Sequence, residues 1–170
     1  RQSWVNLVGE LARPFVRVSA LSSGWTRQPY LALTDRTKGN DFMKNFDMIS
    51  TVDAPRSVGP YSQATRFGEL IFVAGQAAFD PATGKLVTGD IHEQTRQTLK
   101  NIGAILLAAD SGLDCVLKAT IFLHDWRYFA GMNEVFGEVF GDRPPARSTV
   151  CGQRWPEGSL VAIEAVAHVR

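Results

Sequence analysis

The chain has 170 residues, of which 45% are hydrophobic and 21% are charged, so it is long enough for one globular domain with its own core. Its formal net charge of +1 gives no general reason to expect nucleic acid or an anionic membrane surface as a partner. No apolar run approaches the length of a membrane span.

Residues 1–42 differ in composition from the rest of the chain. Basic residues outnumber acidic ones, Ser and Thr are frequent, and the segment does not begin with methionine. This composition is typical of an organellar presequence, and it also fits translated sequence upstream of a start at Met43 or Met48. We therefore predict a disordered, presequence-like or non-native extension over 1–42 and one domain over 43–170. The expected location is the cytoplasm, or the mitochondrion if the extension is a genuine presequence.

Strand patterns dominate the start of the predicted domain. A turn at residues 59–62 precedes a predicted strand at 63–67, which a two-residue connection joins to an apolar strand at 70–73. The second strand is expected to end at 74–76. Gly75 there indicates either a close approach of the backbone to another group or a β-bulge.

Two helices follow, separated by one strand. Asp90 and Glu93 are spaced as in a capping box, which predicts a helix from this point to about Ala109. A strand is predicted at 115–123, with Leu117, Ala119, Ile121 and Leu123 on one side.

The second predicted helix extends from about residue 126 to 140, with Asp125 as its N-cap. Its Met and Phe residues recur at helical spacing, which indicates a core-facing stripe. Asn133 on this helix either reaches a site at the helix edge or is solvated.

Arg147 and Glu164 stand in the last two predicted strands, 146–151 and 160–169, where the alternation would otherwise place apolar residues. If the loop 152–159 joins them as an antiparallel hairpin, Arg147 lies opposite Glu164. A carboxylate between small apolar neighbours needs a cation nearby. Two interpretations are open: a structural ion pair between strands, or a receptor in which Arg147 binds a substrate carboxylate and Glu164 handles a water.

The element order predicts an α+β fold with two helices on one face of a mixed sheet. Apolar residues also occupy the other face, and no segment is left to cover it, so we expect self-association. The sequence contains no GxGxxG dinucleotide-binding motif, no GxxxxGK(S/T) P-loop and no GxSxG nucleophile elbow of the α/β-hydrolases. No metal spacing is present, and Cys115 and Cys151 are expected to be buried free thiols in a reducing compartment.

Six ordered motifs in the domain form a recognisable set. They are GPYSQA (59–64), FVAGQ (72–76), QTRQTLKN (94–101), NEVF (133–136), PPARSTV (144–150) and IEAVA (163–167). On these motifs the chain resembles the RidA (YjgF-type) family of reactive-intermediate deaminases over about residues 51–170. The resemblance implies a chorismate-mutase-like α+β subunit with a mostly antiparallel sheet, assembled as a homotrimer with sites between subunits.

The activity that the resemblance implies is hydrolysis of 2-imino acids, such as 2-iminobutanoate and 2-iminopropanoate, to 2-oxo acids and ammonia. Pyridoxal-phosphate enzymes release such imines and their enamine tautomers. Neither a metal nor an organic cofactor is expected, and neither nucleic acid nor a membrane is an expected partner. The alternative is a non-catalytic trimeric regulator that binds 2-oxo acids or related metabolites in the same cleft.

The resemblance also implies roles for individual residues. Arg147 matches the arginine that binds the substrate carboxylate, and Glu164 matches the glutamate that orients the attacking water. Tyr61 matches a tyrosine that lines the cleft, Gly75 a main-chain contact, and Asn133 a position near the pocket.

Two positions depart from the family pattern. Ala74 replaces a common serine, so one hydroxyl contact to the ligand is missing. Thr149 replaces a common cysteine, which removes a thiol but keeps the backbone groups available for substrate binding. Because Arg147 and Glu164 are both present, activity is expected to survive, with a changed preference among imines.

Overall fold

The computed structural model describes residues 46–152, 155 and 158–170, so the predicted extension and domain boundary lie outside the described part of the chain. The strands are β1 (Asp47–Ile49), β2 (Ala64–Phe67), β3 (Leu70–Ala77), β4 (Val116–Leu123), β5 (Ala146–Cys151) and β6 (Val161–His168). The α-helices are α1 (Ile91–Leu107) and α2 (Phe129–Phe140), and the short 3₁₀ helices are η3 (Leu113–Cys115) and η4 (Trp126–Tyr128).

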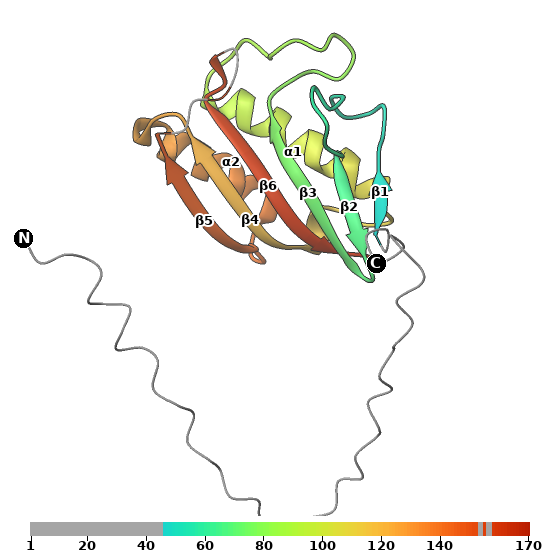
Figure 1. Cartoon of the computed structure of the whole chain (residues 1–170). Coiled ribbons are helices and arrows are strands. Elements are labelled where there is room, and N and C mark those ends of the chain that lie inside the picture. Colours follow the sequence, from blue (N-terminus) through green and yellow to red (C-terminus); the bar gives the residue numbers. More distant parts are fainter. Residues whose placement is uncertain (1–45, 153–154, 156–157) are drawn as a thin grey trace, which may run out of the picture. The chain divides into compact units, whose positions relative to one another are not determined.

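Within the described residues the strands form one six-stranded sheet in the order β1-β2-β3-β6-β4-β5. All neighbouring strands are antiparallel except β4 and β5, which are parallel. Both α-helices lie on the same face of this sheet, and no helix or strand of the described residues covers the opposite face (Figure 1). The predicted α+β layer with a mixed, mostly antiparallel sheet is therefore confirmed.

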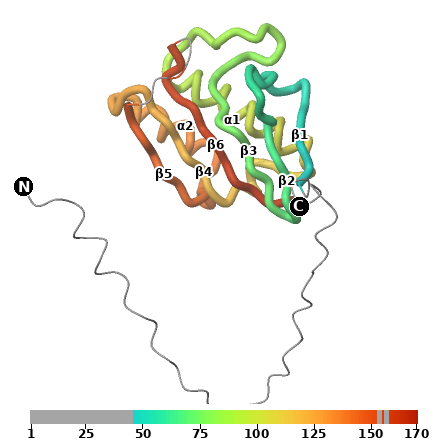
Figure 2. The backbone as a smooth tube through the Cα atoms, in the orientation of Figure 1, coloured from blue at the N-terminus to red at the C-terminus, as the bar shows by residue number. Residues whose placement is uncertain are grey.

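The predicted hairpin of the last two strands is wrong. β4 lies between β5 and β6, as the tube of Figure 2 also shows, and it pairs with both. The burial of each strand gives the reason. β6 is largely apolar and buried, which favours a central place, whereas most side chains of β5 are exposed, which suits an edge.

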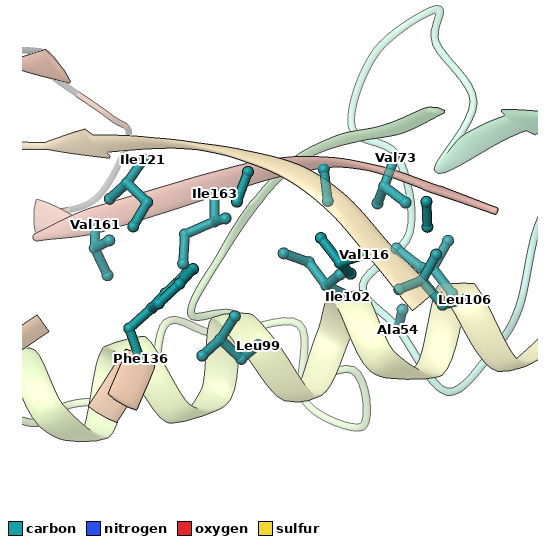
Figure 3. Packing of buried hydrophobic residues seen from close by; sticks show 14 of the residues in the cluster. Ala54, Val73, Leu99, Ile102, Leu106, Val116, Ile121, Phe136, Val161 and Ile163 are labelled. Atoms are coloured by element: carbon teal, nitrogen blue, oxygen red, sulfur yellow. The ribbon is translucent and has the colours of Figure 1, made fainter. Parts of the chain in front are cut away.

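The core lies between the sheet and the helices (Figure 3). Leu99, Ile102 and Leu106 of α1 are almost fully buried against the sheet, because they recur at the spacing of one helical face. Phe136 of α2 enters the same cluster. The predicted core stripe of the second helix is thus confirmed.

The start of α1 is the predicted capping box. Asp90 Oδ1 accepts hydrogen bonds from the main-chain N–H groups of His92 and Glu93, at 2.8 and 3.1 Å. Glu93 Oε2 accepts in return from the N–H of Asp90 at 3.0 Å. The helix thereby satisfies N–H groups that have no partner inside it.

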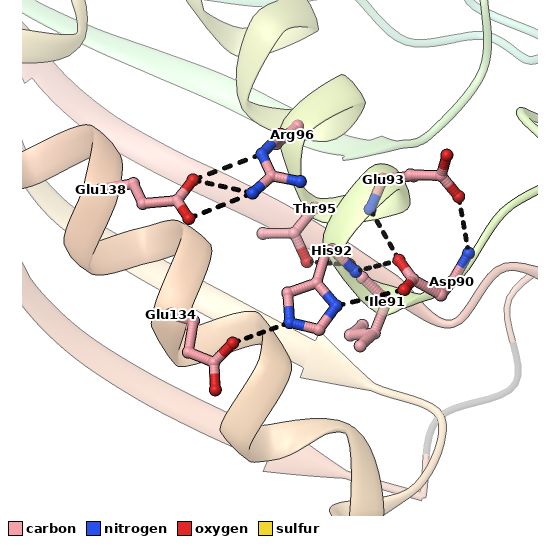
Figure 4. Close-up of polar contacts among 8 residues, drawn as sticks. All are labelled: Asp90, Ile91, His92, Glu93, Thr95, Arg96, Glu134 and Glu138. Carbon is pink, nitrogen blue, oxygen red and sulfur yellow. Dashed lines mark hydrogen bonds and ion pairs between the residues drawn. The ribbon is translucent and has the colours of Figure 1, made fainter.

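The two helices contact each other closely at Gly131 of α2. A β-carbon at this position would lie 2.6 Å from Ile91 Cγ2, so only glycine permits the observed spacing. His92 Nε2 lies 2.9 Å from Glu134 Oε2 beside this contact (Figure 4). The hydrogen bond to Glu134, followed by that to Asp90, raises the pKa of His92 above its ordinary value.

A buried amide fixes the end of β3. Asn101 of α1 is fully buried, and its Nδ2 donates to the carbonyl oxygens of Ala77 and Phe79 at 3.0 and 2.9 Å. Its Oδ1 accepts from Gln97 Nε2 at 2.8 Å. The Ala77 carbonyl also accepts from the N–H of Phe79, so the Phe79 carbonyl is the one that depends on Asn101. Both bonds tie the helix to the strand that carries Gly75.

Several element boundaries differ from those predicted. β3 continues to Ala77 instead of ending near Gly75, and its pairing with β6 is irregular between Val73 and Gln76. The β-bulge interpretation of Gly75 is therefore confirmed. The second helix begins as η4, which Asp125 caps by accepting from the N–H of Arg127 at 2.8 Å. β1 was not predicted, because its three residues carry too little periodicity.

Two side chains take a different environment from the predicted one. Leu117 is exposed because the register of β4 shifts between Val116 and Lys118. Cys151 is exposed at the end of the edge strand, whereas Cys115 is buried, and both are free thiols. No helix in the described ranges is both long enough and apolar enough to cross a membrane.

Candidate functional site

Arg147 points to the helix-covered side of the sheet. It pairs with Ala119 of β4, which is buried beneath the helices, and residues paired across a ladder share a face. Its guanidinium carbon lies 4.9 Å from the centroid of the Phe136 ring and 5.8 Å from that of Phe129. The half-buried guanidinium therefore packs against two aromatic rings of α2.

Thr149 and Asn133 belong to the same side. Thr149 pairs with Ile121, which is fully buried in the core. Asn133 follows Phe129 by four residues and precedes Phe136 by three, so helical spacing places it on the face that carries both rings. We call Arg147, Thr149 and Asn133 the Arg147 half-site.

Glu164 points to the open side of the sheet. It pairs with Thr120, whose neighbours Ala119 and Ile121 take the buried side. The side chain is exposed and makes neither a hydrogen bond nor an ion pair with any residue of the described ranges. Within one chain, the predicted desolvated carboxylate with a cation beside it is therefore not formed, because solvent reaches this side chain.

A shallow cavity of about 170 Å³ adjoins Glu164 on the open face. It is lined by Phe72, Val73, Lys118, Thr120, Glu164, Ala165 and Val166. The ammonium group of Lys118 donates to Ser148 Oγ at 2.6 Å, so this neighbouring cation is held toward the edge strand.

Gly75 lies opposite Glu164, and the turn that contains Tyr61 lies at the same end of β3. Val73 pairs with Ala165 and Gln76 with Ile163, so the bulge formed by Ala74 and Gly75 is opposite Glu164. The N–H of Ala74 donates to the carbonyl oxygen of Gln63 at 3.0 Å, which brings the turn containing Tyr61 to the same end of β3. Tyr61 is 48% exposed. We call Tyr61, Gly75 and Glu164 the Gly75 half-site.

The sequence-predicted site residues therefore divide between the two sides of the sheet, with Arg147 and Thr149 on the helix-covered side and Glu164 on the open side. Arg147 and Glu164 are also two strand spacings apart, or about 10 Å across the sheet. The predicted joint cavity between these two side chains is wrong within one chain. The cause is the place of β4, since a direct β5–β6 pairing would have been needed to set them opposite each other.

Trp155 also belongs to this region, although the sequence analysis treated the loop 152–159 that contains it only as a connection between strands. A β-carbon on Gly75 would lie 3.0 Å from Trp155 Cη2, so the indole packs directly on the glycine. The Phe122 ring lies beside it, with centroids 5.7 Å apart. The sequence feature that could have drawn attention to Trp155 is an aromatic residue inside a loop rich in Gly and Pro.

Comparisons with known proteins place these features in context. The family model described as Endoribonuclease L-PSP matches residues 51–169. A RutC family protein of Pyrococcus horikoshii is 50% identical over 122 residues, which cover 72% of this chain and 97% of the relative. The Homo sapiens protein named 2-iminobutanoate/2-iminopropanoate deaminase is 42% identical over 120 residues, covering 71% of this chain and 88% of the relative.

Solved structures agree with the sequence comparisons. The crystal structure of RidA from the Antarctic bacterium Psychrobacter sp. aligns with a TM-score of 0.70 and 38% identity, covering 72% of this chain and 99% of that one. The crystal structure of E. coli TdcF with bound serine aligns with a TM-score of 0.69 and 35% identity, covering 73% and 99%.

Proposed function

We propose that this chain, which belongs to the RidA/YjgF/L-PSP (RutC) family, hydrolyses reactive 2-imino acids to 2-oxo acids and ammonia. The substrates proposed are 2-iminobutanoate and 2-iminopropanoate, which relatives at 42% identity carry in their names. The alternative is a trimeric regulator that binds 2-oxo acids without turnover.

The observation that carries the proposal is the state of Arg147. Its guanidinium is half-buried on the rings of Phe129 and Phe136, yet it makes no hydrogen bond or ion pair within the described ranges. A guanidinium presents five N–H donors in a rigid fork that matches a carboxylate. Held in this way without an acidic partner, it suits a ligand that brings its own carboxylate.

The reaction needs orientation more than a strong nucleophile. Water adds to the imine carbon, the C–N bond then breaks, and the nitrogen leaves as ammonia after gaining protons. In the proposed mechanism Arg147 fixes the substrate carboxylate, Glu164 orients the water and accepts its proton, and the main chain at Gly75 contacts the substrate. Thr149, Asn133 and Tyr61 complete the pocket walls. Positioning of this kind accelerates a reaction that already proceeds in water.

The site is proposed to form between copies of the chain. Within one chain the two half-sites face opposite sides of the sheet, so one copy cannot place a substrate against both. The open face also exposes large apolar side chains, including Met48 at 75%, Phe67 at 62% and Phe72 at 45%. A ring of three copies would cover this surface and bring the Arg147 half-site of one copy to the Gly75 half-site of the next.

Complementation between two variants tests this arrangement. Arg147→Met and Glu164→Gln disable different half-sites, and each variant alone is expected to lose activity. When equal amounts are co-expressed with different tags and mix at random, about one quarter of the sites in a ring receive both intact half-sites. We expect about that fraction of wild-type activity.

Each outcome has a defined meaning. A mixed trimer that stays inactive would place the whole site within one chain and reject the shared arrangement. Full activity of Glu164→Gln alone would remove Glu164 from the mechanism. Wild-type protein that binds 2-oxobutanoate in calorimetry but never accelerates imine decay would support the regulator instead.

A further inference from the structure

Trp155 covers the one backbone position of the Gly75 half-site that has no side chain. Three carbons of its six-membered ring, Cη2, Cζ3 and Cζ2, lie 3.0, 3.8 and 3.9 Å from where a β-carbon of Gly75 would be. The first distance is shorter than side chains normally tolerate, so the indole occupies the space that the glycine leaves empty. Glycine and tryptophan here are complementary in shape.

Packing positions this indole. Its ring lies against Phe122 of β4 at a centroid distance of 5.7 Å and a tilt of 55°, which is a favourable aromatic geometry. Its Nε1 is shielded from solvent and has no hydrogen-bond partner in the described ranges. A shielded donor without an acceptor costs about 1–3 kcal/mol. The contacts with Gly75 and Phe122 must therefore offset that cost.

Trp155 is also a wall of a second cavity. This cavity has a volume of about 380 Å³ and is further lined by His124, Arg127, Tyr128, Gly158, Ser159 and Leu160. Its size lies within the usual range of small-molecule pockets. The same indole thus contacts Gly75 and borders this cavity, so shortening the side chain would join the cavity to the space over Gly75.

We propose that Trp155 determines specificity by limiting the size of the 2-imino acid side chain that fits beside the indole in the Gly75 half-site. This inference rests on the proposed function, because it assigns a substrate to the Gly75 half-site. On this proposal the indole would admit a methyl or ethyl side chain and obstruct a branched or aromatic one. The chain is then selective for the imines of alanine and 2-aminobutanoate over those of leucine and phenylalanine.

The experiment compares two substrates on three proteins. An amino-acid oxidase with catalase generates 2-iminopropanoate from alanine and 2-imino-4-methylpentanoate from leucine, and semicarbazide trapping measures the decay of each. In wild-type protein kcat/KM should favour the smaller imine. In Trp155→Ala this preference should fall by at least about tenfold, the lower end of what a misfitting hydrophobic group changes. The increase in kcat/KM for the larger imine should come from a lower KM.

Trp155→Phe is the conservative control. It keeps an aromatic ring but cannot reach Gly75 as far as the indole does, so its preference should lie between the other two. Circular dichroism and size-exclusion chromatography on all three proteins exclude unfolding as the cause. An unchanged preference in a folded, active Trp155→Ala protein would overturn the inference.

A binding measurement separates this inference from the proposed function. Calorimetry compares pyruvate with 4-methyl-2-oxopentanoate, which carry the same side chains as the two imines. If wild-type protein accelerates neither imine, the proposed hydrolysis fails. In that case the proposed role of Trp155 in limiting side-chain size is supported only if Trp155→Ala gains affinity for the larger 2-oxo acid. An unchanged affinity would contradict it.

Discussion

Replacing Arg147 with methionine removes the guanidinium but keeps an unbranched stem over the rings of Phe129 and Phe136. The fold should therefore survive, because both rings stay covered and no acidic partner in the described ranges is left unpaired. The substrate carboxylate loses its counter-charge. Any change in rate then reports on the ligand contact.

The expected loss follows from the geometry of the guanidinium. A hydrogen bond to a charged group contributes about 1.5–3 kcal/mol, and about 1.4 kcal/mol corresponds to a factor of ten. Losing one such bond lowers kcat/KM by about 10- to 140-fold, and losing both bonds of a fork lowers it further. The rate of Arg147→Met should therefore approach that of the uncatalysed reaction.

The assay couples the protein to a threonine dehydratase that releases 2-iminobutanoate, with semicarbazide trapping the imine. Wild-type protein should divert the imine from the trap, and Arg147→Met should not. Arg147→Lys is the matched control, since it keeps the charge but lacks the planar fork, and it should retain an intermediate rate. Wild-type turnover by Arg147→Met would remove this residue from substrate binding.

Three further predictions concern the scaffold. His92→Gln removes the contact between the imidazole and Glu134. Folding raises the pKa of His92, so this contact stabilises the wild type fully at pH values below the ordinary histidine pKa of 6.5. The stabilisation is lost as the pH rises through the raised pKa of His92 in the folded protein. The urea midpoints of the two proteins should thus differ near pH 5.5 and converge above pH 8, and a gap independent of pH would contradict this. Asn101→Leu should lower the free energy of unfolding by about 1–3 kcal/mol in chemical denaturation, because the Phe79 carbonyl loses this partner while the Ala77 carbonyl still accepts from the N–H of Phe79. Gly131→Ala should destabilise the protein despite its better helix propensity, whereas Gly137→Ala, with open space around its β-carbon, should stabilise it by about 1 kcal/mol in thermal unfolding.

Local patterns predicted the helices well because each signal acts within a few residues. Asp90 and Glu93 specify a capping box through contacts three residues apart, and the apolar spacing from Leu99 to Leu106 specifies the buried face of α1. The motif set was likewise sufficient to identify the family. The match of the Endoribonuclease L-PSP family model to residues 51–169 confirms it.

The candidate site was predicted residue by residue but not in its arrangement. The alternation along β6 singled out Glu164 as a charged residue among small apolar neighbours, whereas the structure leaves its side chain exposed. The alternation could not reveal that β4 would separate β6 from β5, because strand order depends on contacts between distant segments. With β4 in between, Arg147 takes the helix side and Glu164 takes the open side.

By itself the sequence determined the two helices and most of the strands, the buried stripe of each helix, and that apolar residues would occupy the second face of the sheet as well. Only the tertiary structure decided the order of the strands and hence the face on which each charged side chain lies. Periodicity records how one strand divides its own side chains between two environments. Which strand lies beside it is settled by the burial of all strands together, so the separation of Arg147 from Glu164 had to be seen in three dimensions.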